Sequence, residues 1–397
     1  MSARVLYLHA PFCKRKCSYC DFASFATPAG DPLMASYGAA LLRQIDEAEK
    51  FGLIDGLDTA YVGGGTPTFM GGSTVELVER IAALGPSEVT VEANPDSASL
   101  DLLSNLRDAG ATRISMGIQS LDDGELRMLG RIHDAQTALE ALHVAVSIGL
   151  SVSADLMCAI PLQTPSSWLD TLEGVIGAGV GHVSVYPLMI EEGTPFFQAV
   201  EAGEMPAPDD GDEAARMEEA AAILMAHGYE RYEVASYARP GRMCRHNLSY
   251  WTGASYLGIG AGAASMFGHD EIPLVAGAFP QIGQVPANAH RIRLSCETDR
   301  RLMAEKPSLA DQVFDVEFLN ERESLAEDLM LGARMARGLD RDLVSRSRDV
   351  MGQELDECLA GLIDDGYLDD ALAPTAKGWL LGNELYGRLW DLAEAAD

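Results

Sequence analysis

The sequence predicts an α/β protein whose first half forms a partial parallel (β/α)6 barrel. Three observations support this fold class. Six short apolar runs recur through residues 1–190, and the segments between them carry apolar residues at helical spacing. These segments are long enough to cross back over a sheet, which makes neighbouring strands parallel. The polar and glycine-rich motifs follow the ends of the runs, where the loops of such a sheet converge.

The expected strands and crossover helices alternate along the chain. The strands are predicted at residues 5–9, 59–62, 88–92, 113–117, 152–156 and 182–187. The crossover helices are predicted at residues 36–50, 73–84, 99–109 and 134–147. This pattern amounts to six consecutive βα units.

The second half predicts a different organisation. A proline-rich acidic stretch at residues 201–212 indicates a surface connection out of the barrel. A helix over 213–228, a strand over 232–237 and a glycine-rich segment over 253–262 follow, and helical candidates return at residues 325–336, 353–364 and 377–390. We therefore predict three domains: a barrel core at 1–190, a mixed extension at 191–310, and a small C-terminal helical or winged domain at 311–397.

Charge and hydropathy limit the classes of partner. The chain has a formal net charge of −31, and residues 321–397 hold 18 acidic and 8 basic residues. This charge disfavours nucleic-acid binding. Two long uncharged stretches, 174–190 and 247–268, are interrupted by glycine and polar residues, so we predict no integral membrane span. No targeting sequence is recognisable at the N-terminus, and we expect a cytoplasmic protein.

Three cysteines follow the first predicted strand. Cys13, Cys17 and Cys20 form a C-x3-C-x2-C frame. Three thiolates can hold three irons of a 4Fe-4S cluster and leave the fourth iron open to a small molecule. A closed zinc site needs four ligands, and no second paired motif follows, although His9 stays open as a fourth ligand. Seven cysteines without a secretory signal disfavour a disulfide framework, so an iron-sulfur site is predicted.

Four further loops are expected at the same mouth of the barrel. Gly63-Gly64-Gly65-Thr66 follows the second strand, Glu92 ends the third, Gln119 follows the fourth and Asp155 closes the fifth. A lone glycine triplet predicts a tight turn. Beside the cysteine frame, it predicts a place where the backbone approaches a ligand closely.

The cysteine frame followed by the glycine loop resembles the radical S-adenosylmethionine superfamily. Over nearly its whole length the chain is similar to the HemW-type heme chaperones, which are related to the oxygen-independent coproporphyrinogen III dehydrogenase HemN. Phe22 stands where HemN has a further cysteine, which favours the HemW type. The other matching segments are Arg113-Ile-Ser-Met-Gly-Ile-Gln119-Ser, Leu129-Gly-Arg131-Ile-His133, Asp155-Leu-Met, Pro161-Leu-Gln163-Thr164, Glu191-Glu-Gly-Thr-Pro-Phe196 and Tyr232-Glu through Cys244-Arg-His246-Asn247-Leu-Ser-Tyr250-Trp251.

The resemblance implies cofactors and the residues that hold them. It implies a 4Fe-4S cluster on Cys13, Cys17 and Cys20, whose open iron is chelated by the methionine part of S-adenosyl-L-methionine. Arg131 and Asp155 could instead form a structural ion pair. No catalytic residue is assigned. Positions that contact the cluster-bound S-adenosylmethionine match Tyr7, Gly64 and Glu92, and positions that in HemN line a second cofactor molecule or nearby space match Gly65, Thr66, Gln119, Arg131 and Asp155.

A second motif concerns heme. The segment with His246, Asn247, Tyr250 and Trp251 is similar to the HemW motif implicated in heme binding. A histidine nitrogen can ligate heme iron, and two aromatic rings offer flat surfaces to a porphyrin. A packed structural corner is the alternative.

Nearby residues bear on the same prediction. Cys244 is a further candidate for heme attachment, whereas Cys158, Cys296 and Cys358 are expected to be bystander thiols. The segment Gly260-Ala-Gly262-Ala-Ala264-Ser265 lacks a histidine that is common in the family.

The resemblance implies a heme chaperone that binds heme, a 4Fe-4S cluster and S-adenosylmethionine, and delivers heme to an acceptor protein. An electron donor is a second expected partner. The alternative is an enzyme, either a coproporphyrinogen III dehydrogenase or a HemN-like radical S-adenosylmethionine methyltransferase. A cluster-bearing interaction protein without turnover is the third possibility.

Overall fold

The computed structural model describes residues 3–394 and contains the six predicted parallel strands. They lie side by side in chain order, and each pairs in parallel with the next. The prediction of six βα strands is confirmed. Their bounds are β1 (Val5–Ala10), β4 (Thr59–Gly64), β5 (Glu88–Ala93), β6 (Arg113–Gln119), β7 (Ser151–Cys158) and β8 (His182–Pro187).

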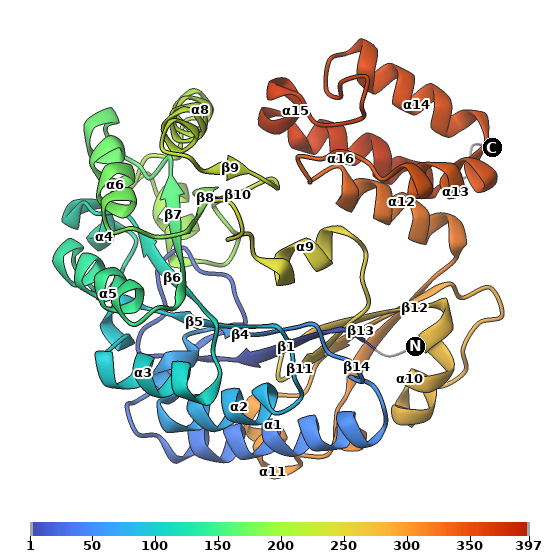
Figure 1. Ribbon diagram of the computed structural model, residues 1–397, viewed down its shortest axis with the longest axis horizontal. Helices are drawn as coiled ribbons and strands as arrows, with labels where there is room; N and C mark the ends of the chain where they lie inside the picture. The colour runs from blue at the N-terminus through green and yellow to red at the C-terminus, as the bar shows by residue number, and fades with distance from the viewer. Residues whose placement is uncertain (1–2, 395–397) are drawn as a thin grey trace.

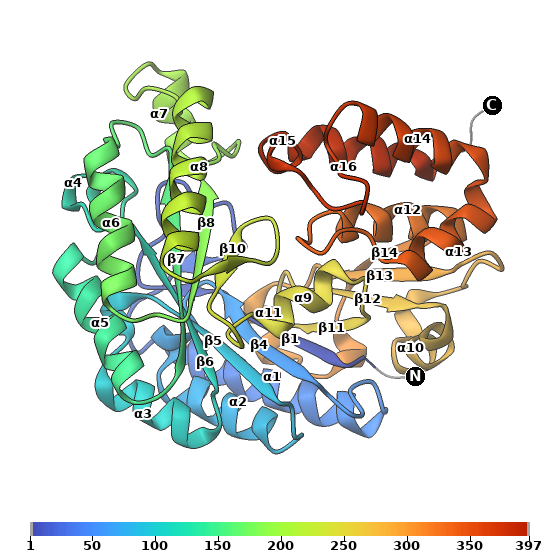
Figure 2. The same cartoon turned by 45° about the horizontal axis from the view of Figure 1, so that its top comes forward.

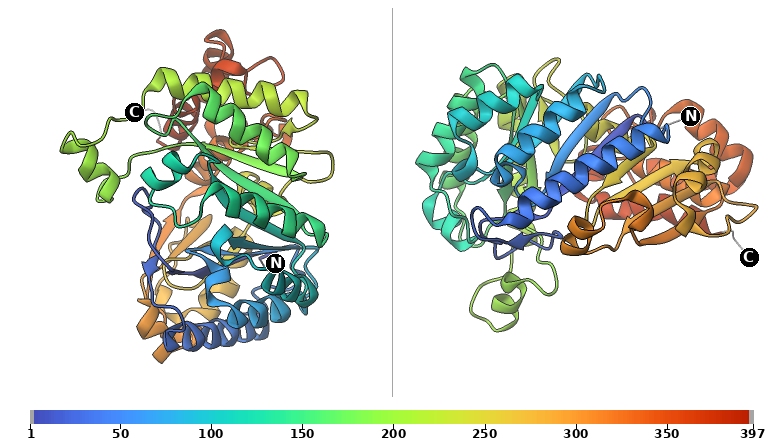
Figure 3. Two further views of the ribbon diagram at one scale, coloured as in Figure 1. Left: turned by 90° about the vertical axis from the view of Figure 1, so that its left-hand side faces the viewer. Right: turned by 90° about the horizontal axis from the view of Figure 1, so that it is seen from below.

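Helices cover the outer side of these strands (Figure 1). Seen from below in Figure 3, α1 and α2 lie across the outside of the sheet. Their starts are chemically defined, because the side chains of Asp31, Ser99 and Asp134 accept backbone N–H groups of the first turns of α1, α3 and α5. The helices are α1 (Pro32–Lys50), α2 (Gly72–Ala82), α3 (Leu100–Ala109), α4 (Asp123–Met128), α5 (Ala135–Ser147) and α6 (Pro165–Gly177).

The barrel is open, as predicted, and its sheet continues at both edges. Beside β1 lies the parallel strand β11 (Tyr256–Ile259), followed by the antiparallel strands β12 (Ala264–Gly268), β13 (Arg291–Cys296) and β14 (Phe314–Leu319). Beside β8 lie the antiparallel strands β10 (Ser236–Ala238) and β9 (Glu230–Arg231). Two short strands, β2 (Phe12–Cys13) and β3 (Phe25–Ala26), pair across the cysteine loop.

Three local predictions differ from the structure. Only the end of the strand expected over 232–237 is a strand, because β10 begins at Ser236. Residues 232–235 form a turn between β9 and β10, in which the Glu233 carboxylate accepts the N–H of Ala235. The glycine-rich segment contains a strand, β11. A Cβ on Gly258 would lie 2.0 Å from the Ala264 carbonyl oxygen, so glycine is required for this close strand contact. The helix expected over 377–390 is interrupted at Leu381 into α15 (Ala376–Leu380) and α16 (Gly382–Trp390).

The remaining helices lie in the second half of the chain. The C-terminal helices share a hydrophobic cluster that includes Leu329, Leu355 and Leu385, and Figure 2 shows them stacked on one side of the sheet, near α9. The three-domain division stays a prediction. These helices are α7 (Pro195–Glu201), α8 (Asp210–Ala226), α9 (Arg245–Trp251), α10 (Ile272–Ala278), α11 (Arg300–Glu305), α12 (Glu321–Gly332), α13 (Arg341–Met351) and α14 (Gln353–Asp364).

Short 3-10 helices complete the secondary structure. They are η1 (Pro67–Met70), η2 (Pro95–Ser97), η3 (His269–Glu271), η4 (Pro280–Ile282), η5 (Leu309–Asp311) and η6 (Asp391–Ala393). Within residues 3–394, none of the helices combines the length and the apolar composition that a membrane span needs.

Candidate functional site

A cavity of about 510 Å³ lies within the curve of the parallel strands. It brings together the three cysteines and all but one of the residues predicted to contact S-adenosylmethionine or to line the space beside it. The exception is Tyr7, which is half-buried and whose hydroxyl lies 2.9 Å from His9 Nδ1. The predicted residues that line the cavity are Cys13, Cys17, Cys20, Gly64, Gly65, Thr66, Glu92, Gln119, Arg131 and Asp155.

Polar groups are directed at the cysteine sulfurs. The Thr66 hydroxyl donates to Cys13 Sγ at 3.5 Å, and Arg131 Nη1 donates to Cys17 Sγ at 3.4 Å. A Cβ on Gly65 would lie 3.0 Å from Cys13 Sγ, so this glycine keeps the space beside the sulfur open. Donors of this kind stabilise thiolates, which are the form of cysteine that binds iron. The donor set therefore fits an iron-sulfur cluster.

A zinc site at the same loop would need the cysteines and His9 to converge on one position. In the part of the chain that the structure describes, no three His, Cys, Asp or Glu side chains converge on one metal position. Each thiolate of a 4Fe-4S cluster binds a different iron, so the three sulfurs need not converge. His9 has both ring nitrogens engaged, because Nε2 lies 3.0 Å from the Ala23 carbonyl oxygen and Nδ1 contacts Tyr7. The histidine alternative for a zinc ligand is therefore not supported.

The glycine loop is tied to the next strand through Glu92. The Tyr61 hydroxyl donates to Glu92 Oε1 at 2.8 Å, and the Gly64 N–H donates to Oε2 at 2.9 Å. Burial raises the pKa of Glu92 to about 7, and these two hydrogen bonds oppose that rise. Gly64 has φ +112°, and a Cβ there would meet the His9 ring, so glycine is required at this position.

Arg131 and Asp155 lie in separate networks. Arg131 Nη2 donates to Asn94 Oδ1 at 2.8 Å and to the Gly117 carbonyl at 2.6 Å. Asp155 accepts hydrogen bonds from Ser115 and Ser153. Across residues 3–394 no ion pair joins Arg131 to Asp155, so the structural ion pair considered from the sequence is wrong.

Gln119 lies at an irregular point of the sheet. The register between β6 and β7 shifts between Gly117 and Gln119, and Gln119 has φ +68°. A residue other than glycine is strained in this conformation, and such strain is often found at functional sites. A Cβ on Gly117 would lie 2.9 Å from Gln119 Nε2, so the small residue makes room for the amide.

The inner face of the strands is polar, which the sequence analysis missed. Alternate residues of β5 to β8 point into the cavity, and Glu92, Ser115, Ser153 and His182 are register partners in neighbouring strands. The signal that was missed is that polar residues recur at every second position of these strands, which the sequence analysis treated only as apolar runs. The additional strand residues that line the cavity are Tyr61, Thr90, Ala93, Arg113, Ser115, Gly117, Ser153, Met157, His182, Ser184, Tyr186 and Pro187.

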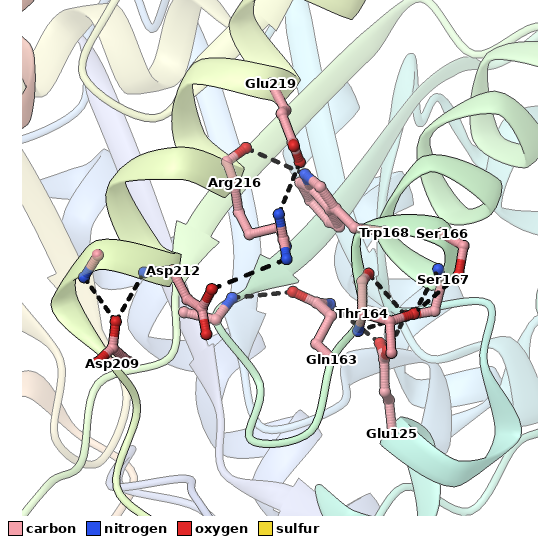
Figure 4. A network of polar contacts seen from close by, with 12 residues as sticks. Glu125, Gln163, Thr164, Ser166, Ser167, Trp168, Asp209, Asp212, Arg216 and Glu219 are labelled. Carbon is pink, nitrogen blue, oxygen red and sulfur yellow. Dashed lines mark hydrogen bonds and ion pairs between the residues drawn. The ribbon is translucent and has the colours of Figure 1, made fainter.

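A buried carboxylate organises the loop after β7. Glu125 accepts hydrogen bonds from Ser120 at 2.6 Å, from Ser167 at 2.6 Å and from Gln163 at 3.0 Å. Figure 4 shows Glu125 beneath Thr164 and Ser167, with Arg216 between Asp212 and Glu219 on the other side. The loop has a left-handed backbone at Ala159 and Leu162, and Leu162 is 77% exposed.

The four predicted heme residues all lie in α9. His246 is buried, its Nδ1 lies 3.1 Å from the Thr59 hydroxyl and its Nε2 lies 3.0 Å from the Tyr250 hydroxyl. Burial lowers the pKa of His246 to about 3, so the ring is neutral. Asn247 lines the 510 Å³ cavity, whereas Trp251 lines a second cavity of about 240 Å³.

The other cysteines are not arranged for attachment. Cys244 lines the main cavity, but its thiol donates to Glu88 at 3.6 Å and burial raises its pKa to about 12. The thiol is therefore protonated and unreactive at neutral pH. Cys158 and Cys296 are buried, and Cys358 is partly buried.

Comparisons with known proteins agree with this geometry. The family model described as the Radical SAM superfamily matches residues 7–175. The Heme chaperone HemW of Bacillus subtilis is 30% identical over 397 residues, which cover 96% of this chain and 97% of that protein. The chain belongs to the HemW family of radical S-adenosylmethionine proteins.

Other members of the family are also similar. The Heme chaperone HemW of Mycobacterium tuberculosis is 38% identical over 66% of this chain and 69% of that protein. The bovine mitochondrial radical S-adenosyl methionine domain-containing protein 1 is 39% identical over 66% of this chain, and the match spans 60% of its own length. The superfamily to which the HemW family belongs implies a 4Fe-4S cluster and S-adenosylmethionine.

A solved structure supports the fold. Coproporphyrinogen III oxidase HemN of Escherichia coli superposes with a TM-score of 0.74, and the superposition covers 99% of this chain and 90% of that chain. The sequence identity is 22%, so this likeness concerns the fold alone. The α/β fold predicted for the HemW-type chain is confirmed.

Proposed function

We propose that this protein is a heme chaperone of the cytoplasm, which binds heme and a 4Fe-4S cluster with S-adenosylmethionine and delivers the heme to an acceptor protein. One observation carries the proposal. A single cavity is lined by the three cysteines and the glycine loop, in a chain whose match spans 97% of a protein named heme chaperone HemW.

Each part of the cavity has a role in this proposal. Cys13, Cys17 and Cys20 hold the cluster, which when bound supplies the electron that cleaves the sulfonium of S-adenosylmethionine. Gly64 and Glu92 bind the amino-acid part of the cofactor, since both residues line the cavity and a carboxylate accepts hydrogen bonds from an ammonium group. Tyr7 supports this wall through His9. The remaining wall, which accommodates the rest of the ligand, consists of Gly65, Thr66, Gln119, Arg131 and Asp155.

Heme binding involves α9 in this proposal. The neutral ring of His246 has the protonation state that iron ligation needs. Ligation through Nε2 requires the hydrogen bond to Tyr250 to open, because that nitrogen is engaged in the present conformation. Asn247 connects this helix to the main cavity, while Tyr250 and Trp251 supply the aromatic surfaces.

A second candidate function is catalysis on a porphyrinogen or another substrate. Gln119, Arg131 and Asp155 all line the cavity, and the polar strand faces provide a wall that a second ligand could contact. A coproporphyrinogen III dehydrogenase or a radical S-adenosylmethionine methyltransferase would use such a wall.

One preparation tests both functions. The protein is reconstituted anaerobically with iron and sulfide, and it is then titrated with hemin and assayed with coproporphyrinogen III and S-adenosylmethionine. Saturable heme binding near one heme per chain without decarboxylation supports the chaperone, and transfer to an apo-hemoprotein completes its test. Decarboxylation with release of deoxyadenosine supports the enzyme instead. Absence of saturable heme binding overturns the chaperone proposal.

A further inference from the structure

A chain of three buried side chains ends on Asp155, which is half-buried and lines the cavity. Asp155 Oδ1 accepts a hydrogen bond from the Ser153 hydroxyl at 3.2 Å, and Ser153 Oγ lies 2.7 Å from His182 Nδ1. His182 Nε2 lies 2.8 Å from the Tyr232 hydroxyl. Ser153 and Asp155 share one face of β7, His182 is the register partner of Ser153 on β8, and Tyr232 lies between β9 and β10.

The direction of each hydrogen bond can be assigned. The Cys244 N–H donates to the Tyr232 oxygen at 3.3 Å, and Tyr232 then has its own proton to donate to His182 Nε2. With Nε2 as acceptor, a neutral His182 carries its proton on Nδ1 and donates it to Ser153 Oγ. The Ser153 proton is thereby directed to Asp155. Every donor in the chain points toward the carboxylate.

The charge state of His182 agrees with this assignment. Burial lowers the pKa of His182 well below its usual value, and the positive charge of Arg113 lowers it further. The imidazole is therefore neutral and has one N–H and one acceptor nitrogen, as the chain requires. Hydrogen bonds aligned in one direction polarise one another, which strengthens the last one.

We propose that Tyr232, His182 and Ser153 are positioning residues that fix the orientation of Asp155 and keep it available as a hydrogen-bond acceptor for a donor group of the ligand in the cavity. The presence of this ligand in the cavity depends on the proposed function, whereas the chain of hydrogen bonds is independent of it. The ligand class is one with an ammonium or hydroxyl donor, because the free capacity of Asp155 is acceptor capacity.

The surroundings of Asp155 have opposing effects on the pKa of its carboxyl group. Burial raises its pKa, and the serine hydroxyls of β6, β7 and β8 and the charge of Arg113 oppose the rise. Three other titratable groups interact electrostatically with Asp155. They are Glu92 on β5, Tyr61 on β4 and Tyr186 on β8. A hydrogen bond donated to a carboxylate stabilises its charged form and lowers its pKa. Loss of the Ser153 hydroxyl therefore raises the pKa of Asp155.

The experiment measures the titration of Asp155 directly. Infrared carboxyl bands of the reconstituted protein are recorded from pH 4 to pH 9, and the band of Asp155 is isolated by subtracting the spectrum of Asp155→Asn in the same background. We expect Ser153→Ala to move the midpoint up by about one pH unit, Tyr232→Phe to move it up by less, and Ser153→Thr to leave it in place.

A distant serine provides the matched control. Ser347 on α13 is fully buried and its hydroxyl has no hydrogen-bond partner, so Ser347→Ala removes a buried hydroxyl without touching the chain. A role in packing alone would lower stability without moving the midpoint. An unchanged midpoint in Ser153→Ala and Tyr232→Phe would overturn the proposal.

Ligand binding is measured separately by equilibrium dialysis with S-adenosylmethionine. We expect Ser153→Ala to weaken binding about ten-fold at pH 7, since about 1.4 kcal/mol corresponds to that factor. Failure of the unmodified protein to bind S-adenosylmethionine contradicts the proposed function. The infrared midpoint still decides whether the positioning chain exists.

Discussion

The ring of His246 on α9 and the hydroxyl of Thr59 on β4 lie within 3.1 Å of each other, although 187 positions separate them in the sequence. This contact fixes one nitrogen of His246 to the barrel and leaves Nε2, which faces Tyr250, as the nitrogen that a ligand would have to compete for. The two roles considered for this histidine, heme ligand and structural corner, therefore make opposite predictions for Tyr250.

Tyr250→Phe is expected to tighten heme binding if His246 is the ligand. The substitution removes the hydroxyl that occupies Nε2, and a hydrogen bond of about 1 kcal/mol no longer opposes ligation, which corresponds to about a five-fold gain in affinity. Hemin titration followed by the Soret band provides the measurement, and His246→Ala should weaken binding. Tyr256→Phe is the control, because Tyr256 packs edge-on against Tyr250 without a hydrogen bond to His246. A loss of affinity in Tyr250→Phe equal to that in His246→Ala would favour the structural corner.

Gly65→Ala is expected to impair cluster assembly. The new Cβ would lie 2.9 Å from the Phe12 carbonyl oxygen and 3.0 Å from the Ala10 carbonyl oxygen, and these backbone atoms cannot move aside. We expect a loss of about 1–3 kcal/mol in stability and a fall in iron and sulfide bound per chain. Gly72→Ala is the matched control, since a Cβ there meets no atom within 4 Å. Equal iron contents in the two variants would contradict a requirement for space beside Cys13.

Local motifs can be predicted from the sequence, whereas contacts between distant segments in the protein interior cannot. The six parallel strands and the cysteine loop are predictable, because apolar runs and metal-ligand spacing are local patterns. The strand β11 was missed because Gly258 is required by contact with Ala264, which a local pattern cannot indicate. The partners of His246 were unpredictable for a similar reason, since Thr59 is brought to it only by the fold. By contrast, Ser153 and His182 were predictable in principle from polar residues at a period of two.

The unfolding free energy should depend on pH through Glu92. Its pKa is about 7 in the folded protein and 4.5 is its ordinary value, so the folded state retains a proton that the unfolded state has already lost. The resulting stabilisation is complete below pH 4.5 and is lost as pH rises through 7. Glu92→Gln imitates the protonated form, and we expect its stability relative to the unmodified protein to rise by about 2–3 kcal/mol between pH 5 and pH 8.

Urea unfolding of the reconstituted protein at several pH values measures this difference. Glu76→Gln on α2 is the control, because Glu76 is exposed and lies outside the cavity. A difference between Glu92→Gln and the unmodified protein that stays constant with pH would show that Glu92 does not titrate in this range.

Glu125 is expected to hold the loop after β7 in its strained conformation. The buried carboxylate accepts from Ser120, Ser167 and Gln163, and Gln163 in turn accepts the N–H of Ala159, so the left-handed backbone at Ala159 is fastened through this one side chain. Glu125→Ala leaves these donors unpaired in a buried site, and we expect a loss of about 3–5 kcal/mol. Glu125→Gln keeps one acceptor oxygen, and its amide group can donate to a serine hydroxyl that rotates. We therefore expect this variant to lose only about 1 kcal/mol of stability.

Because Leu162 is already exposed, release of the loop should also make residues 159–163 the first site of cleavage in limited proteolysis. A cleavage pattern in Glu125→Ala that matches that of Glu125→Gln would mean that the loop is held by its own backbone and that the carboxylate contributes only to the start of α6.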